Sequence, residues 1–411
     1  MKPETTILKP RTANPKPQLP LSHIRVLDLT RILSGPFCTM KLGDMGAEVI
    51  KIEQPAKGDD TRTWGPPFIK GESAYFLSVN RNKKSLTLDL KSDEGKKILT
   101  KLITRCDVLV ENFRAGVMEK LGLGFDNVKK INPRIIYCSI SGYGQTSSRS
   151  HKPSYDLIVQ GESGLMDMTG FPDGPPTKVG ISLADVNAGN LAFEGILLAL
   201  LQREKSGKGQ FIDISLLDGL LSLFAYQSQI ALSSNTKVIR KGNRHPTITP
   251  YETYGTKDGY INIAVGSEGA WENFCKAIQR EEVQHDKRFA TNARRVENRE
   301  ALEKILIPIM KKKRSAEWIR ILSRFDVPAG NINPLSEILE LKLLKERSMI
   351  TSMRHPSIGT LKMVRNPIKL SQTSPNQFSP PPLLGQHTVD VLKWLGYSDS
   401  AIQLLKNKNV I

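Results

Sequence analysis

The sequence predicts an α/β fold built on a parallel sheet, because short apolar strands alternate with helical segments along the first half of the chain. The first strand is expected at residues 24–30 and the second at 47–53. Between them, Gly35 and Pro36 open a helix, since proline is tolerated in the first helical turn. Parallel sheets of this kind bind ligands beyond the carboxyl ends of their strands, so the functional site is expected there.

Three further strands continue the series, at residues 85–90, 107–111 and 135–140. The helix between the first two begins after Ser92, a residue type that caps helix N-termini. Asp93 and Glu94 follow it and suit the positive end of the helix dipole. The repeated strand–helix–strand order predicts helices on both faces of the sheet.

The texture of the chain changes in its second half. A long apolar helix at 187–203, a strand at 211–214 and a further helix complete the first pattern. Beyond about residue 237, a Tyr-rich segment at 251–265 reads as a hairpin and is followed by charged helices to about residue 325. This part of the chain is expected to form a smaller α+β domain.

The C-terminal region is expected to return to the first domain, because Val391, Leu392 and Leu395 have the apolar spacing of a packed helix. The large domain would then be built from both chain ends. The expected boundaries are a disordered leader at 1–21, the large domain at 22–236, the small domain at 237–340 and the return at 341–411.

The charge of the chain favours anionic substrates over nucleic acid. The formal net charge is +18, but Lys and Arg are dispersed over most of the 411 residues. The densest basic run, 311–314, has no interleaved aromatic residue that could stack on bases. We therefore expect no nucleic-acid partner and interpret the charge as a general positive field, which suits polyanionic substrates.

The sequence offers no sign of a metal, a disulfide framework or a membrane span. Its four cysteines are far apart, with no His at metal-ligand spacing, and Cys106 and Cys138 adjoin apolar runs typical of a core. The longest apolar stretch, 191–201, is interrupted by Glu194 and is shorter than the roughly 18 residues that a span requires. The Pro-rich first twenty residues lack the apolar region of a secretory signal and are expected to be a disordered leader or the remainder of one after processing.

Several longer blocks occur in an order that resembles the class III CoA-transferases, the formyl-CoA transferase-like or CaiB/BaiF family. The blocks are 25–30 with 35–36, 46–53, 58–62, 82–85 with 88–91, 107–113, 142–144, 155–156, 174–177, Asp185 with 188–189, and 382–388. The resemblance runs from about Ser22 to the last residue. It implies an open Rossmann-like large domain, a smaller middle α+β domain and an interlocked homodimer.

The resemblance implies that Asp185 is the catalytic nucleophile. The chemistry agrees, because a carboxylate with an ordinary pKa near 3.9 is ionised at neutral pH and needs no adjacent base. The helix dipole would help to keep it ionised, and Gly189 would leave room for acyl groups. The alternative is that Asp185 is an ordinary N-cap before the apolar helix.

The resemblance also implies a CoA site formed by Leu88, Asp89, Leu90, Lys91, Asn112, Phe113, Lys120 and Tyr143, with Arg62 as a further candidate. CoA presents adenine and phosphates, which call for a stacking face and cationic donors. Phe113 could instead be a core residue and Lys120 a solvated helix charge. Leu33 and Gln54 differ from the formyl-CoA type, and its glycine-rich loop is not evident in the corresponding 242–246.

Among family members, the chain most resembles those that act on dicarboxylates in the mitochondrial matrix. This implies succinyl-CoA or hydroxymethylglutaryl-CoA as donor, glutarate or succinate as acceptor, and CoA as a substrate without a tightly bound cofactor. Arg244, His245 and Tyr155 are the candidates for acceptor contacts. The alternatives are a racemase of 2-methylacyl-CoA and a non-catalytic acyl-CoA or nucleic-acid binder.

Exchange of the substrate α-proton distinguishes transferase from racemase. A racemase needs an acid/base group on each face of the carbon, and its histidine is replaced here by Tyr155 before Asp156. We expect no incorporation of solvent deuterium at the α-carbon of an acyl-CoA, followed by mass spectrometry, and no loss of turnover on chelation. Rapid deuterium incorporation would favour the racemase, and inhibition by a chelator would reveal a metal.

Overall fold

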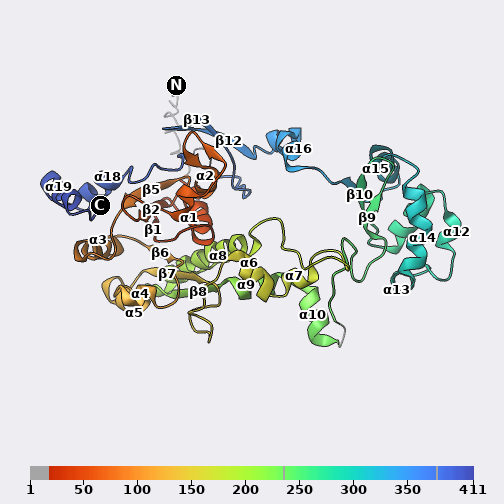
Figure 1. The fold of residues 1–411 in the computed structure, drawn as a ribbon, viewed down its shortest axis with the longest axis horizontal. Coiled ribbons are helices and arrows are strands. Elements are labelled where there is room, and N and C mark those ends of the chain that lie inside the picture. Colours follow the sequence, from red (N-terminus) through yellow and green to blue (C-terminus); the bar gives the residue numbers. More distant parts are fainter. Residues whose placement is uncertain (1–17, 235–236, 376–377) are drawn as a thin grey trace, which may run out of the picture. The chain divides into compact units, whose positions relative to one another are not determined.

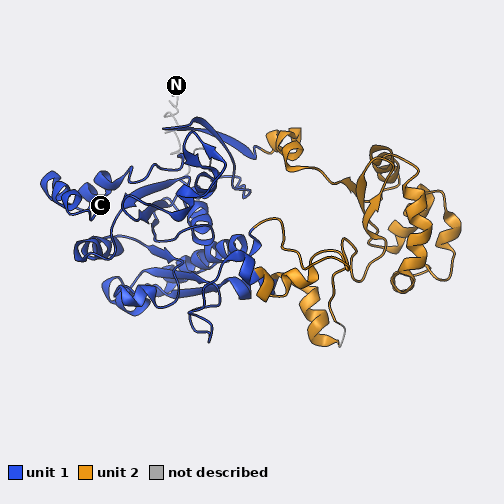
Figure 2. Ribbon diagram, in the orientation of Figure 1, with its two compact units in different colours: residues 1–159, 182–222, 348–411 blue, residues 160–181, 223–347 orange. Residues whose placement is uncertain are grey.

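The computed structural model describes residues 18–234, 237–375 and 378–411, which form two compact units (Figures 1 and 2). The first unit contains the chain up to Val159 together with Ser182–Ser222 and Ser348–Ile411. The second contains Gln160–Ile181 and Leu223–Arg347. The predicted leader falls almost entirely outside the described residues, and the predicted domain boundaries stay a prediction.

A six-stranded parallel sheet forms the centre of the first unit, in the order β5-β2-β1-β6-β7-β8. Its strands are β1 (Arg25–Asp28), β2 (Glu48–Glu53), β5 (Lys83–Thr87), β6 (Val108–Glu111), β7 (Ile136–Ser141) and β8 (Phe211–Ser215). Strand β1 pairs with β2 on one side and with β6 on the other, so the direction of winding reverses between β1 and β6. This confirms the predicted α/β fold, and the reversal is where such sheets bind ligands.

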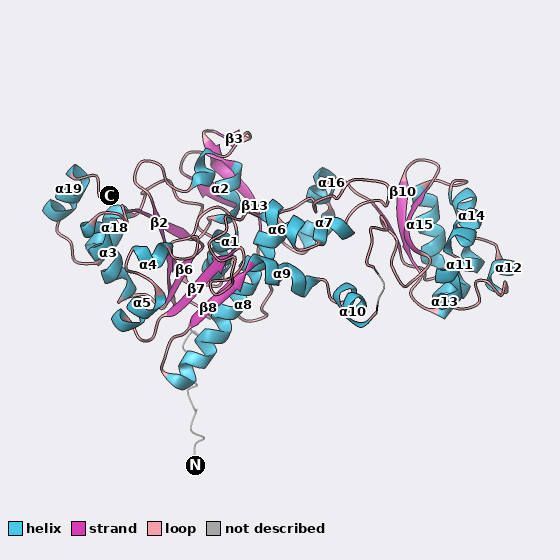
Figure 3. Ribbon diagram, turned by 60° about the horizontal axis from the view of Figure 1, so that its bottom comes forward, coloured by secondary structure: helices cyan, strands magenta, loops and turns pink. Residues whose placement is uncertain are grey.

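Helices cover both faces of this sheet (Figures 1 and 3). Leu27, Ile50 and Leu109 face a core shared with α3, α5, α18 and α19, while α1 packs on β1 and β2 and α8 packs on β7 and β8. The helical elements here are α1 (Ser34–Asp44), a 3-10 turn (Asp60–Thr63), α2 (Ala74–Val79), α3 (Asp93–Ile103), α4 (Val117–Lys120), α5 (Phe125–Ile131), α6 (Asp156–Glu162), α8 (Leu183–Ser206), α9 (Leu216–Leu223), α18 (Thr388–Trp394) and α19 (Asp399–Asn407).

The C-terminal helices return to the first unit as predicted. Val391, Leu392 and Leu395 belong to the core beneath the sheet. The segment also covers the edge strand β5, since the backbone N–H of Thr87 donates to the Thr388 hydroxyl at 3.1 Å. Two hairpins of this unit, β3 (Phe68–Ile69) with β4 (Glu72–Ser73) and β12 (Ile350–His355) with β13 (Gly359–Val364), were not predicted from the sequence.

The second unit contains an antiparallel sheet in the order β11-β10-β9. Trp271, Phe274 and Trp318 are buried in its core. The predicted hairpin is confirmed as β9 and β10. The elements are α7 (Leu165–Met168), α10 (Tyr226–Ser233), β9 (Tyr251–Gly255), β10 (Tyr260–Ala264), α11 (Glu268–Ala277), α12 (Glu281–Gln284), α13 (Asn292–Glu297), α14 (Arg299–Met310), α15 (Ser315–Arg324), β11 (Ala329–Asn331), α16 (Leu335–Glu340) and α17 (Lys342–Glu346).

Helix α8 is longer than the apolar stretch recognised in the sequence. By length and composition alone, its 24 residues could cross a membrane, and it is the one such helix among the described residues. Core helices of soluble proteins pass the same test, and α8 buries Ala188, Ala192, Phe193 and Ile196. All four cysteines are also buried and unpaired, as predicted for Cys106 and Cys138.

Two fully buried ion pairs involve residues of β1, β2 and β5. Lys83 Nζ lies 3.1 Å from Asp28 Oδ2, and Lys51 Nζ lies 2.9 Å from Asp59 Oδ2. The Thr39 hydroxyl of α1 also donates to Asp28, at 2.7 Å. Burying charges is costly unless they are paired and hydrogen-bonded, so each partner depends on the other.

Replacing Lys83 tests this dependence. Lys83→Met leaves the Asp28 carboxylate buried without its cation, and we expect the free energy of unfolding to fall by about 3–5 kcal/mol in chemical denaturation. Lys84→Met is the matched control, because the adjacent Lys84 pairs with Glu48 at the surface and contributes less than about 1 kcal/mol. Equal effects of the two substitutions would contradict the structural role of the buried pair.

Candidate active site

A pocket of about 190 Å³ lies at the carboxyl ends of β1, β6 and β7, at the reversal of the sheet. Its lining includes Arg31, Ser34, Asn112, Phe113, Arg114, Lys152, Tyr155 and Asp185. Sites for whole drug-sized ligands are usually larger, about 300 Å³ or more. The pocket is therefore sized for the reacting end of a long substrate, and its mixture of one acid with several cations suits an anionic one.

Asp185 lies in the first turn of α8. The N-cap of this helix is Ser182, and its side chain makes no capping hydrogen bond. Asp156 instead accepts a hydrogen bond from the backbone N–H of Ala184, at 2.8 Å. The interpretation of Asp185 as an N-cap is therefore wrong, and its carboxylate is left to face the pocket.

The surroundings of Asp185 raise the pKa of its carboxyl group to about 7. Burial is the largest cause, because it disfavours the charged form, and the negative charge of Asp156 acts in the same direction. Hydrogen bonding from the Ser34 side chain lowers the pKa but does not offset these effects. Burial thus works against the ionisation at neutral pH that was expected for Asp185.

Gly189, one turn further along α8, allows this helix to approach α1. A Cβ atom at residue 189 would lie 2.6 Å from the backbone oxygen of Ser34 and 3.1 Å from the Phe37 ring. The expectation that this glycine makes room for acyl groups is therefore wrong, because the space is filled by α1. The same contact is reinforced by Lys41 Nζ, which donates to Asn190 Oδ1 at 2.6 Å.

The loop after β1 is held by the buried charges. Lys51 Nζ donates to the backbone oxygen of Thr30 at 2.7 Å, and the backbone N–H of Ile32 donates to Asp59 Oδ1 at 3.3 Å. Ile32 has φ = +71°, a left-handed conformation that costs a β-branched residue about 1–3 kcal/mol. Strain of this kind is maintained only where the surroundings enforce it, as they do beside this pocket.

The predicted CoA residues divide into two groups. Asn112 and Phe113 line the pocket, and Tyr143 follows β7 with Lys152 Nζ 5.5 Å from its ring centroid. Leu88, Asp89, Leu90 and Lys91 follow the edge strand β5 instead. Leu88 is a core residue, whereas Lys91 is exposed.

Two other predicted CoA residues have different surroundings. Lys120 is exposed at the end of α4 and does not line the pocket around Asp185. Arg62 makes two hydrogen bonds of 2.8 Å to Glu53 and stacks on Phe76, with 3.7 Å to the ring centroid. Its guanidinium group thus has a structural partner in the first unit.

The predicted acceptor residues lie in different units. Tyr155 lines the Asp185 pocket, whereas Arg244 and His245 line a pocket of about 620 Å³ in the second unit. Arg244 Nη2 lies 2.6 Å from Glu303, and its Nε lies 3.6 Å from Glu252. His245 packs against the rings of Tyr226 and Tyr251.

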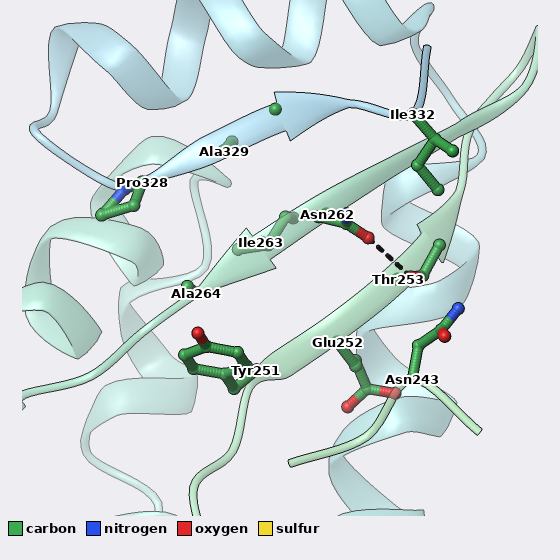
Figure 4. Close-up of a pocket in the computed structure, with 11 residues that line it drawn as sticks. Asn243, Tyr251, Glu252, Thr253, Asn262, Ile263, Ala264, Pro328, Ala329 and Ile332 are labelled. Carbon is green, nitrogen blue, oxygen red and sulfur yellow. Dashed lines mark hydrogen bonds between the residues drawn. The ribbon is translucent and has the colours of Figure 1, made fainter. Parts of the chain in front are cut away.

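A second pocket of the second unit, about 650 Å³, is lined by residues of its antiparallel sheet (Figure 4). Glu252, Tyr251 and Asn243 lie along one side of it, opposite Ala329 and Ile332 of the region around β11. The pKa of Glu252 is raised to about 7 by burial and by the neighbouring Glu303. Arg244 therefore sits beside two carboxylates that compete for its charge.

Sequence reasoning missed Arg31, Ser34, Arg114, Lys152 and Asp156. A usable signal existed for two of them, because Arg31 directly follows the predicted strand 24–30 and Arg114 lies three residues after the end of the predicted strand 107–111, where a parallel sheet places its ligands. Ser34 and Asp156 carry no such local signal. Within the described part of the chain, no group of three or more His, Cys, Asp or Glu side chains could hold a metal ion.

The fold and the pocket define an open α/β protein with a carboxylate at the point where the strand order of its sheet reverses. Residues 21–388 match the model of CoA-transferase family III, and the chain belongs to this family. It is 42% identical to the succinyl-CoA:glutarate CoA-transferase of Mus musculus, over 95% of this chain and 90% of that protein. It is 39% identical to the succinate–glutarate CoA-transferase of Agrobacterium fabrum, over 93% and 97%.

Solved structures agree with this family. A CaiB/BaiF family protein from Brucella suis is 38% identical, with a TM-score of 0.81 over 92% of this chain and 100% of that one. The family and the fold predicted from the sequence are thereby confirmed.

Proposed function

We propose that this protein moves CoA from succinyl-CoA to a dicarboxylate such as glutarate, with Asp185 as the nucleophile. The observation that carries the proposal is the placement of Asp185. Its carboxylate does not cap a helix, and it faces a small cationic pocket where the strand order of the sheet reverses. The names of the two relatives support the substrates, since both refer to glutarate and to succinate or succinyl-CoA.

The reaction needs two covalent intermediates on Asp185. The carboxylate attacks the thioester carbonyl of succinyl-CoA and expels CoA thiolate, which leaves a mixed anhydride. The thiolate then attacks the Asp185 carbonyl of the anhydride, releasing succinate and forming an aspartyl-CoA thioester. The acceptor carboxylate repeats the two steps in reverse, and glutaryl-CoA leaves with Asp185 regenerated. Overall, one thioester and one carboxylate are exchanged for another thioester and another carboxylate, so the reaction balances without ATP or a redox partner.

The residues around Asp185 serve the reacting end of the substrate. Asn112, Phe113 and Tyr143 are proposed to contact CoA close to the thioester, with Tyr155 beside the acyl group. Leu88 to Lys91 and Lys120, with Arg62, are proposed to contact the nucleotide end, which the 190 Å³ pocket is too small to enclose. Hydroxymethylglutaryl-CoA as a donor and succinate as an acceptor stay part of the proposal.

Assembly and location are also proposals. We propose a homodimer, without nucleic-acid or membrane partners, in the mitochondrial matrix. The similarity to a mammalian relative supports this location.

Replacing Asp185 tests the nucleophile. Asp185→Asn keeps the shape of the side chain but removes the attacking oxygen anion, and we expect exchange between succinyl-CoA and glutarate to fall at least about a thousandfold.

Incubating the wild-type protein with acyl-CoA should add CoA or acyl mass to the peptide containing Asp185, and hydroxylamine should remove this added mass. Because the ionised form attacks, kcat/KM should rise with pH through an apparent pKa near 7.

Asp218→Asn is the matched control, since Asp218 is an exposed acid in the first turn of the neighbouring helix α9. It should retain wild-type turnover. Near-normal exchange by Asp185→Asn would refute the assignment of the nucleophile.

Arg244 is our candidate for the distal carboxylate of the acceptor. A buried carboxylate needs a cation, and Arg244→Ala is expected to raise the KM for glutarate roughly tenfold while leaving the KM for succinyl-CoA within about twofold. The ratio of kcat/KM for glutarate to kcat/KM for butyrate should also fall. Initial-rate measurements over a panel of mono- and dicarboxylates provide the test.

Glu303→Gln separates recognition from folding. Both substitutions break the ion pair between Arg244 and Glu303, but only Arg244→Ala removes the cation. Similar losses of thermal stability in both variants, with unchanged glutarate kinetics, would assign Arg244 a purely structural role. Arg81 would then be the next residue to test as a partner of the distal carboxylate, although it already makes hydrogen bonds of 2.7 and 2.6 Å to the Asp44 carboxylate.

A further inference from the structure

Arg31 lines the Asp185 pocket on a backbone that its neighbours fix. The residue follows β1, and its N–H donates to Asn112 Oδ1 at 2.8 Å, while its carbonyl oxygen accepts from Asn112 Nδ2 at 2.7 Å. The next residue, Ile32, has the strained left-handed φ of +71°. Backbone strain of this kind is concentrated at functional sites, so the arginine that it positions is a candidate for a substrate contact.

The side chain of Arg31 has a partner that an anion can replace. Its Nη1 lies 2.9 Å from Asp60 Oδ2, and the Arg31 side chain is 50% exposed. Exposed ion pairs contribute little, because water screens them. Asp60 also pairs with Lys57, whose Nζ lies 3.2 Å from its Oδ1. A substrate anion can therefore take the place of Asp60 beside Arg31 and leave Asp60 paired with Lys57.

An aromatic ring of the same pocket contacts the guanidinium group. Arg31 Cζ lies 5.6 Å from the ring centroid of Phe113, which also lines the pocket. A guanidinium has several N–H donors in one plane, and the contact with Asp60 engages Nη1. Donors remain for a second anion, and this planar arrangement suits a carboxylate, which it can bind through two parallel hydrogen bonds.

A dicarboxylic substrate needs a cation close to Asp185. When one end of the substrate reacts, its free carboxylate brings a second negative charge into a pocket of about 190 Å³ that already contains this acid. Like charges at such short range repel each other unless a cation offsets them. Arg244 and Arg81, the candidates chosen from the sequence, are not among the described residues that line this pocket, whereas Arg31 is.

We propose that Arg31 binds the free carboxylate of the dicarboxylic acyl group, with Asp60 as the competing partner of its guanidinium. This inference rests on the proposed function and adds a residue that determines specificity for dicarboxylic acyl groups. Since Arg31 and Asp185 belong to the same unit, the inference does not depend on Arg244 in the second unit. Arg114 and Lys152 also line the pocket and are included in the comparison below.

The competition with Asp60 predicts effects of opposite sign on the KM for succinyl-CoA. Arg31→Gln removes the cation and should raise this KM at least about tenfold. Asp60→Asn removes the competing anion and should lower it about two- to fivefold. Lys57→Gln is the matched control, because Lys57 pairs with the same carboxylate but is not among the residues that line the pocket, and it should leave the KM within about twofold.

A second measurement does not depend on turnover. Calorimetric titration of Asp185→Asn, which lacks the attacking oxygen anion, compares the Kd of succinyl-CoA with that of butyryl-CoA, which has the same number of acyl carbons but no free carboxylate. Adding Arg31→Gln should weaken the binding of succinyl-CoA at least about tenfold and change that of butyryl-CoA less than about twofold. The selective loss should be smaller when Arg114→Gln or Lys152→Gln is added instead.

The outcomes separate this inference from the proposed function. Equal weakening of succinyl-CoA and butyryl-CoA by Arg31→Gln would overturn the inference, because it would assign Arg31 to the CoA part or to folding. A rise in KM in Asp60→Asn, or a larger selective loss in Arg114→Gln or Lys152→Gln, would overturn it as well. A wild-type protein that forms no adduct on Asp185 would instead refute the proposed function, while the binding comparison would still decide the role of Arg31.

Discussion

The site depends on the close approach of α1 and α8. This contact has no room for a side chain at Gly189, and it joins the loop after β1 to the first turn of α8. Helix α1 follows β1 and α8 precedes β8, so the contact brings together segments separated by some 150 residues of chain. Without it, Ser34 and Asp185 would have no fixed relation, and the pocket between β1 and β6 would lose one wall.

The buried ion pairs near this contact fix the conformation of the loop after β1. The two buried lysines and their aspartates hold the β1 loop in a conformation that includes a strained Ile32. Burial also raises the pKa of Asp185, and the negative charge of Asp156 acts in the same direction. A buried carboxylate carries little bound water, so attack on a thioester requires little further desolvation. The fraction of the carboxylate that is ionised depends on the hydrogen-bond donors around it.

Much of the fold follows from local patterns in the sequence. Apolar alternation predicted β1, β2 and β6, and Ser92 does cap α3 by accepting from the N–H of Gly95 at 3.0 Å. The ionisation of Asp185 could not be predicted, because its burial comes from residues distant in the chain. The same holds for Arg62, whose partner Glu53 is decided by tertiary packing and not by any motif around the arginine.

The return of the chain to the first unit has a consequence for synthesis. Residues 388–410 contribute Thr388 to the edge strand and Val410 to a hydrogen bond with Asp89, at 2.8 Å, and their apolar side chains fill the core beneath the sheet. On the ribosome, the N-terminal strands therefore emerge long before the segment that covers them, and their edge is open to pairing with other chains. Nascent chains stalled before residue 388 should thus be held by chaperones, and release of the last turns is the step that ends this exposure.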